Sequence, residues 1–169
     1  VSTTTCVTVG AGGTIRATTN GGTNWNGQTS GTTQALWDVD CVSSTTCWIV
    51  GGAGVIRKTV NGGATWTNQT PGGFTTRLRG VSCVDALRCW AVGDGGAVRT
   101  TADGGTTWTP LTSGTTQVLR SVFMVNASTG YLTGDSATVR KTTDGGTTWT
   151  ALAVPTAAYQ SASCISVDD

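Results

Sequence analysis

The phrase TADGGTTW at residues 101–108 has three near copies elsewhere in the chain. The copies are TTNGGTNW at 18–25, TVNGGATW at 59–66 and TTDGGTTW at 142–149. Each ends in a tryptophan, and the four tryptophans follow one another at steps of 41, 42 and 41 residues. The same steps relate two further columns, Arg16, Arg57, Arg99 and Arg140, and Gly10, Gly51, Gly93 and Gly134. Three columns with one period indicate an internal repeat, and a period near 41 is typical of a four-stranded propeller blade.

The third repeat reads as four short strands. LRGVSCV is expected to be the innermost, RCWAVG the second, AVRTT the third and TTWTPL the outermost. The DGG sequences at 94–96 and 103–105 supply turns, because glycine accepts positive φ. The sequence therefore predicts an all-β chain, a four-bladed β-propeller of four-stranded antiparallel blades in a single domain of residues 1–169. The expected blades are 1–34 together with 160–169, 35–76, 77–117 and 118–159.

Composition excludes several classes of protein. The net charge is +1 and only 11% of residues are charged, which gives no footprint for nucleic acid. No apolar run approaches the ~18 residues of a membrane span. The opening VSTTTC lacks an initiator methionine, as after removal of a signal peptide. Six cysteines at spacings unlike those of a zinc site indicate disulfides, so we expect a secreted or extracytoplasmic protein.

The repeat selects among the cysteine pairings. Cys41 and Cys47 fall on the first two strands of the second blade, and Cys83 and Cys89 hold the same positions in the third. Each pair is expected to form a bond within its own blade.

The two remaining cysteines lie near the ends of the sequence. Cys6 aligns with Cys47 and Cys164 with Cys83, so the ends are expected to build one composite blade. Two alternatives remain open. An intramolecular Cys6–Cys164 bond would close a compact four-bladed ring, or the C-terminal strand would complete the composite blade of a neighbouring molecule and give an eight-bladed ring or a filament.

The repeated phrase resembles the Asp-box, or BNR repeat, with the pattern Ser/Thr-x-Asp-x-Gly-x-Thr-Trp. This box occurs in sialidases and in photosystem II stability- and assembly-factor-like propellers. The latter are more similar, because VGDGGAVRTTADGGTTW at 92–108 combines the glycine turn, the arginine and the box in one blade. The resemblance implies a propeller whose boxes lie at the blade periphery, away from any catalytic centre.

The box residues are accordingly expected to be structural; they are Asn20, Trp25, Asn61, Trp66, Asp103, Trp108, Asp144 and Trp149. Asparagine at two of the four boxes can cap the same turn but cannot act as a carboxylate base. A site that needed the charge would be missing from half of the copies.

Catalytic residues are scarce. The chain has no histidine and no glutamate, and its nine aspartates show no glycosidase arrangement. A sialidase would also need a nucleophilic tyrosine, and Tyr131 and Tyr159 fall in or beside ordinary strand positions. The expectation is a protein that is not an enzyme and has no metal or cofactor.

The candidate ligand-binding residues start the innermost strands, facing the central channel or its mouth; they are Trp37, Arg79, Arg120 and Gln160, with Arg77 on the face of Arg79. Arginine beside tryptophan can hold an anion or stack on a sugar. The alternative is that Arg79 and Arg120 only line the ring, satisfied by carbonyls or by Asp38. Trp48 and Trp90 are expected in the core between blades.

Two functions follow. The preferred one is a non-catalytic, secreted, disulfide-reinforced propeller that serves as an extracellular structural module and self-assembles, with itself as partner, into an oligomer or filament through the terminal strand. The alternative is a glycan- or protein-binding module, a lectin or an assembly-factor-like scaffold, that uses the channel mouth.

Overall fold

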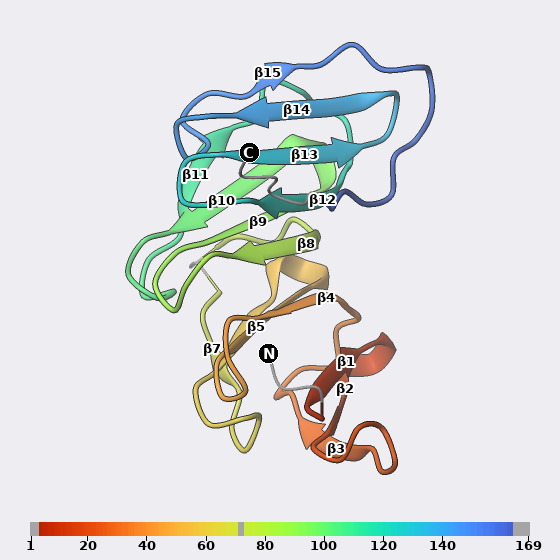
Figure 1. Cartoon of the computed structure of the whole chain (residues 1–169), viewed down its shortest axis with the longest axis vertical. Coiled ribbons are helices and arrows are strands. Elements are labelled where there is room, and N and C mark those ends of the chain that lie inside the picture. Colours follow the sequence, from red (N-terminus) through yellow and green to blue (C-terminus); the bar gives the residue numbers. More distant parts are fainter. Residues whose placement is uncertain (1–3, 71–72, 164–169) are drawn as a thin grey trace, which may run out of the picture.

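The computed structural model describes residues 4–70 and 73–163. Its strands form four antiparallel sheets (Figure 1). The first contains β1 (Cys6–Val9), β2 (Thr14–Thr18) and β3 (Asn26–Thr29); the second contains β4 (Leu36–Cys41), β5 (Cys47–Gly51), β6 (Ile56–Thr59) and β7 (Thr67–Asn68). The third contains β8 (Leu78–Cys83), β9 (Cys89–Gly93), β10 (Ala97–Thr101) and β11 (Thr109–Thr112); the fourth contains β12 (Leu119–Met124), β13 (Gly130–Gly134), β14 (Thr138–Thr142) and β15 (Thr150–Ala151). The predicted all-β propeller architecture is confirmed.

Each sheet follows the chain order, and a short 3-10 turn joins β1 to β2, β5 to β6 and β9 to β10. These turns are η1 (Ala11–Gly13), η2 (Gly52–Gly54) and η3 (Asp94–Gly96). The first three strands of the third sheet lie where the sequence predicts them, whereas the outermost, β11, begins at Thr109 and not at Thr106. The first sheet differs, since it has three described strands. Residues 160–163 form no strand, and Cys164, on which the composite blade depends, lies outside the described residues.

The sheets stand one after another along the length of the molecule, and the first and fourth lie at its opposite ends (Figure 1). Packing joins neighbours in this row: β4 contacts β1, β8 contacts β4 and β5, and β12 contacts β8 and β9. Within residues 4–70 and 73–163, the row is therefore open. Closure of a ring by the two ends of one chain, the first of the two alternatives, is not seen among these residues.

The core lies between sheets, because each sheet buries its face against the next. Leu36, Leu78 and Leu119 start the inner strands and are almost fully buried. Trp48 packs between the second and third sheets and Trp90 between the third and fourth, at 0% and 3% exposed. The prediction of inter-blade tryptophans therefore agrees with the packing. Disulfides Cys41–Cys47 and Cys83–Cys89 tie inner to second strands within the second and third sheets.

The box phrase forms a hydrogen-bonded turn. The Asp103 carboxylate accepts the N–H of Thr107 at 2.9 Å and its hydroxyl at 2.6 Å, and it also accepts the hydroxyl of Thr101. Gly104 and Gly105 have φ of +74° and +94°, which a side chain would strain. Asn61 accepts the Thr65 N–H at 3.0 Å in the same way. The amide thus replaces the carboxylate without loss of the turn.

Acid is expected to weaken the two charged boxes. Hydrogen bonds from the following threonines, chiefly their hydroxyls, lower the pKa of Asp103 and of Asp144 to about 2. An unfolded carboxyl titrates near pH ~4, so their stabilisation is complete above that pH and is lost as pH falls toward about 2. Thermal melts between about pH 5 and about pH 2 should therefore drop more steeply for the wild type than for Asp103→Asn/Asp144→Asn. Equal slopes would contradict this origin of the acid sensitivity.

Asp38 and Asp40 have the opposite effect on the pH dependence of stability. Both residues are present in the wild type and in the Asp103→Asn/Asp144→Asn variant, so their effect is the same in the two proteins. Burial raises the pKa of both, so their contribution favours the fold at low pH and is lost as pH rises through their folded pKa. Their carboxylates link neighbouring inner strands. Asp38 accepts the N–H of Val81 at 2.9 Å and Asp40 that of Cys83 at 2.7 Å. These residues therefore join the second sheet to the third.

The arginine column holds the crossing segments, by which we mean the chain between the outermost strand of one sheet and the inner strand of the next. Arg57 donates to Ser30 O at 3.0 Å and Gly31 O at 2.9 Å, and Arg140 donates to Gly114 O at 2.7 Å. Arg99 lies 4.2 Å from the ring centroid of Phe74. Arg57, Arg99 and Arg140 therefore hold the second, third and fourth sheets against the crossing segment that precedes each of them.

Candidate binding face

The candidate residues Trp37, Arg79 and Arg120 each occupy an irregularity of an inner strand. Pairing with the second strand shifts between Leu36 and Asp38, and it shifts in the same way in β8 and β12. Such a bulge bends the strand and redirects the side chain of the extra residue. The leucine before each bulge is buried, whereas Trp37 is 48% exposed. The repeat thus presents one side chain from each of three successive inner strands.

Trp37 lies under two guanidinium groups. The Cζ atoms of Arg77 and Arg79 lie 5.5 Å and 5.3 Å from its ring centroid, within cation–π range. Arg77 directly precedes β8 and Arg79 lies within it, so the second and third sheets build this contact together. An exposed indole fixed by two cations is an apolar platform of defined orientation.

Two aspartates extend the cluster. Arg79 donates through Nε to Oδ1 of Asp94, and Arg77 Nη1 lies 3.9 Å from Oδ2 of the same carboxylate. Arg120 donates to both oxygens of Asp135, at 2.5 Å and 3.1 Å. We refer to Trp37, Arg77, Arg79, Asp94, Arg120 and Asp135 as the binding face. Three guanidinium groups against two carboxylates leave it one unit of positive charge.

The ion pairs fix the charge state of this face. The hydrogen bond from Arg120 lowers the pKa of Asp135, and the nearby Arg79 acts in the same direction. The same bond raises the pKa of Arg120. The geometry is bidentate, which orients the guanidinium as well as neutralising it. Arg77 is the freest of the three cations, with its side chain 46% exposed.

The expected partners of the arginines need correction. Asp38 was the carboxylate considered for Arg79 and Arg120, but it is half-buried and accepts the backbone N–H groups of Val39 and Val81. The actual partners are Asp94, which was expected only to supply the DGG turn at 94–96, and Asp135, which holds the same position in the fourth repeat. One signal in the sequence could have identified them. Arg79 and Arg120, which occupy the repeat position of Trp37, are each followed 15 residues later by an aspartate, whereas Trp37 is followed at that distance by Gly52.

Gln160, the fourth candidate, is exposed and belongs to no strand. It follows Tyr159, whose N–H donates to Gly134 O at the end of β13. The structure therefore places Gln160 beside the fourth sheet, and among the described residues no hydrogen bond or ion pair joins it to the binding face. Its role remains a prediction.

Within the described part of the chain, no group of three or more histidines, cysteines, aspartates or glutamates lies close enough to hold a metal ion. The described residues include no helix that is long and apolar enough to cross a membrane.

Comparison with protein families gives one match. The family described as Photosynthesis system II assembly factor YCF48 matches residues 17–113, which is more than half of the chain. This segment includes three of the four boxes and most of the binding face. No curated protein matches the sequence.

Solved structures share the fold. "YCF48 bound to D1 peptide" has a TM-score of 0.71 at 20% identity and covers 88% of this chain, and YCF48 from Cyanidioschyzon merolae has 0.69 at 17% and covers 91%. A GH74 enzyme from Niastella koreensis has 0.63 at 20% and covers 82%. The chain spans only 49% and 57% of the two YCF48 chains and 25% of the GH74 chain. At these identities the similarity establishes the propeller architecture.

Proposed function

The chain belongs to the family of the photosynthesis system II assembly factor YCF48, and from this membership we propose that it is a non-enzymatic, protein-binding propeller module. Its partner is an extended protein segment held on the binding face. The single observation that carries the proposal is the exposed indole of Trp37, fixed under Arg77 and Arg79. A rigid aromatic residue with flanking arginines is the composition typical of interface hot spots.

The chemistry of the face defines what the segment should offer. Trp37 provides an apolar surface, so an aromatic or aliphatic side chain can pack on it. Arg77 lies half exposed beside it and keeps the surplus positive charge, so an acidic group can pair there. A solved relative is a YCF48 with a bound D1 peptide, and peptide binding on a related propeller supports the same mode here.

The absence of a catalytic role is part of the proposal. GH74 enzymes share the architecture, but at the binding face of this chain Asp94 and Asp135 are committed to ion pairs with arginine. The hydrogen bond from Arg120 lowers the pKa of Asp135, which makes this carboxylate a poor general base, and the oxygens of Asp94 are engaged by Arg77 and Arg79. The two disulfides are consistent with an oxidising compartment, and we place the protein outside the cytoplasm.

A peptide titration tests the binding function. Dodecapeptides selected from a phage-displayed random library on the wild type would be labelled and titrated by fluorescence anisotropy. Trp37→Ala is expected to weaken binding by about 30-fold, the equivalent of ~2 kcal/mol for a hot spot, and Arg77→Ala by a smaller factor. Val60→Ala is the matched control, since Val60 is an exposed apolar residue in a box turn.

The outcomes of that titration separate the candidates. Equal affinity for wild type and Trp37→Ala would reject the binding face. The same variants on a glycan array test the alternative function, a lectin. That function would be identified if no peptide bound and if glycan binding were lost in Trp37→Ala.

A second proposed role is structural: the module self-assembles with copies of itself outside the cell. It is supported by Cys6, whose side chain is exposed and which has no disulfide partner among the described residues. This role uses the ends of the row of sheets and leaves the binding face free.

A further inference from the structure

We propose that β1 of one molecule pairs with residues 160–164 of a second copy, which completes the first sheet and joins the two copies head to tail. The inference specifies the self-assembly proposed above and rests on it, and it is independent of peptide binding. Four features carry it: the path of the chain after β15, the free edge of β1, the space beside Gly10 and the two outward faces of the row.

The chain that leaves the fourth sheet follows the path of a crossing segment. Tyr159 donates its N–H to Gly134 O at 2.9 Å, as Leu36 donates to Gly10 O at 3.0 Å where the chain enters β4. Two residues before Tyr159, the carbonyl oxygen of Ala157 accepts the N–H of Ala137. Tyr159 thus stands where Leu36 stands, and residues 160–163 begin where an inner strand begins. The fourth sheet presents these residues with no described sheet to receive them.

The edge of β1 is suited to receive such a strand. β1 pairs with β2 so that Cys6 faces Thr18, just as Cys47 faces Thr59 in the second sheet. On its other side Cys47 pairs with Cys41 of the inner strand. No described residue takes that place beside Cys6.

A cavity of about 170 Å³ opens along this edge. Val7 of β1 and Val39 of β4 line it, together with the Cys41–Cys47 pair, so its walls are mostly apolar. A strand added to the edge would supply backbone groups to β1 and cover these side chains.

Gly10 shows that the first sheet has room for the entering chain. A Cβ at Gly51, Gly93 or Gly134 would meet the carbonyl oxygen of the residue before the inner strand, at 2.6, 1.9 and 2.2 Å. A Cβ at Gly10 would meet nothing within 4 Å. The first sheet therefore has the glycine that this close approach requires, and the space that a carbonyl oxygen fills in the other sheets is free beside Gly10. Ala158, which precedes Tyr159, corresponds to the residue whose carbonyl would fill it.

The outward faces of the end sheets match the faces buried inside the row. Between interior sheets, a box tryptophan packs against the tryptophan of the preceding sheet: Trp108 shares a cluster with Trp48, and Trp149 with Trp90. At the ends, the box residue Trp25 is 42% exposed, and Tyr131, at the position of Trp48, is half-buried. Trp25 of one copy packed on Tyr131 of the next would repeat the interior contact.

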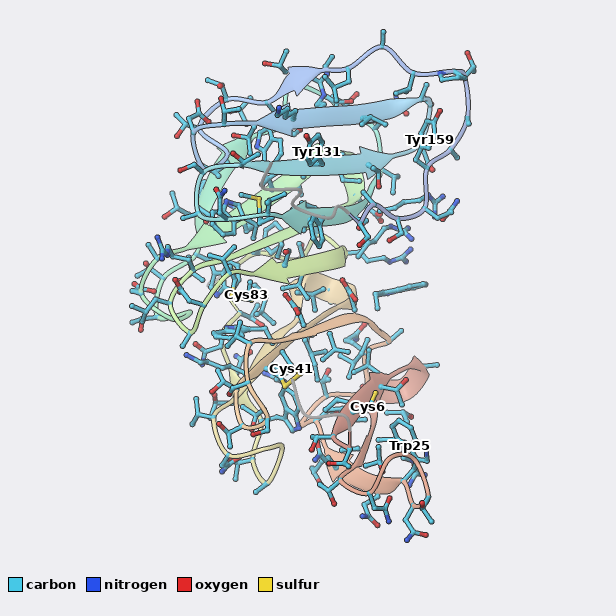
Figure 2. All side chains as sticks on the ribbon, in the orientation of Figure 1. Cys6, Trp25, Cys41, Cys83, Tyr131 and Tyr159 are labelled. Carbon is cyan, nitrogen blue, oxygen red and sulfur yellow. A yellow bond between two sulfur atoms is a disulfide. The ribbon has the colours of Figure 1, made fainter. Side chains whose placement is uncertain are left out.

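A second copy is the occupant because one molecule does not bring these parts together. Figure 2 shows Cys6 and Trp25 at one end of the row and Tyr131 and Tyr159 at the other. Cys164 follows residue 163 and aligns by repeat position with Cys41, the disulfide partner of Cys47, so we expect its thiol to bond to that of Cys6. The two thiols then form a disulfide by exchange with a small disulfide such as glutathione disulfide. The small disulfide takes up both electrons and both protons and is reduced to two thiols.

Isotope mixing tests the exchange between copies. Reduced ¹⁴N- and ¹⁵N-labelled chains are mixed in equal amounts, oxidised with glutathione disulfide and digested for mass spectrometry. About half of the peptides linked through Cys6 and Cys164 should carry one label of each kind, and mass photometry should show multimers. Linked peptides with a single label throughout would show closure within one chain and would overturn the proposal. A Cys6–Cys6 link as the main product would also overturn it, since it reflects only an exposed thiol.

Two variants separate strand docking from thiol chemistry. Cys6→Ser should abolish the disulfide-linked multimers. Multimers held by strand pairing alone should still form at high protein concentration. Gly10→Ala should keep the monomer's melting temperature and reduce multimers at least tenfold, because the new Cβ occupies the space for the carbonyl of Ala158. If Gly10→Ala formed as much multimer as the wild type, the second copy would not enter the first sheet beside Gly10, and this strand placement would be rejected. Peptide affinity at the binding face should be unchanged in both variants, so failure of assembly and failure of the binding function are read separately.

Discussion

Replacing Trp48 by alanine is expected to lower the free energy of unfolding by about 3 to 5 kcal/mol, the range for a large aromatic residue removed from a core. Trp48 is fully buried between the second and third sheets, where it packs with Leu78 and Trp108. The surrounding strands are held by their own ladders and by the two disulfides, so they cannot collapse into the space. Urea denaturation followed by circular dichroism measures the loss.

The matched control for this variant is Trp25→Ala. Trp25 belongs to the same residue type but lies on the outward face of the first sheet, and 42% of its side chain is exposed. In dilute monomer its removal should cost less than half as much as removal of Trp48. Equal losses would show that the cores between sheets do not dominate stability.

Gly93→Ala is expected to destabilise the fold by about 1 to 3 kcal/mol or more, the usual range for an overpacked site. Its backbone is extended, so the effect is steric and not conformational. The added Cβ would lie 1.9 Å from the carbonyl oxygen of Arg77, and backbone cannot move aside as a side chain does. The carbonyl also accepts the N–H of Asp94 at 3.0 Å, so a shift would disturb the carboxylate that binds Arg79.

Gly10→Ala is the control, because it occupies the same column and adds the same methyl group in open space. Its monomer should unfold at the denaturant concentration of the wild type. The Gly93 variant should also bind selected peptides more weakly, since Arg77 and Asp94 belong to the binding face. A Gly93→Ala protein as stable as Gly10→Ala would contradict the close approach seen in the structure.

The repeat made much of the fold predictable. Four strands per repeat follow from the alternation of β-branched residues and glycine turns, and the shared period of the Trp, Arg and Gly columns sets the blade length. The Cys41–Cys47 and Cys83–Cys89 pairings followed from the same alignment, because a cross-strand pair recurs at the same place in each blade. These features are local or periodic, and a sequence displays both.

The arrangement of the sheets was less predictable, because closure depends on how far each pair of sheets turns relative to the last. That angle is set by packing at residues such as Leu36 and Trp48 and leaves no pattern in the sequence. The alignment of Cys6 with Cys47 identified a shared strand position, and it could not say which molecule supplies the partner.

The binding face was predicted in part. Trp37, Arg77 and Arg79 were placed together by repeat position, and the structure brings them into contact. Asp94 and Asp135 were missed, because an aspartate in a turn is already accounted for by that turn. The bulge that turns out Trp37 depends on a shift of one residue between two strands, and no residue type marks it.

Indole chemical shifts test the central claim, that the binding face and not the repeated box carries the function. The chain has seven tryptophans, so a ¹⁵N-labelled sample gives a small set of Nε1–H signals that single Trp→Phe variants assign. Titration with a selected peptide should shift the signal of Trp37 and leave those of Trp66, Trp108 and Trp149 in place. Saturable shifts at the box tryptophans with an unmoved Trp37 would contradict the account.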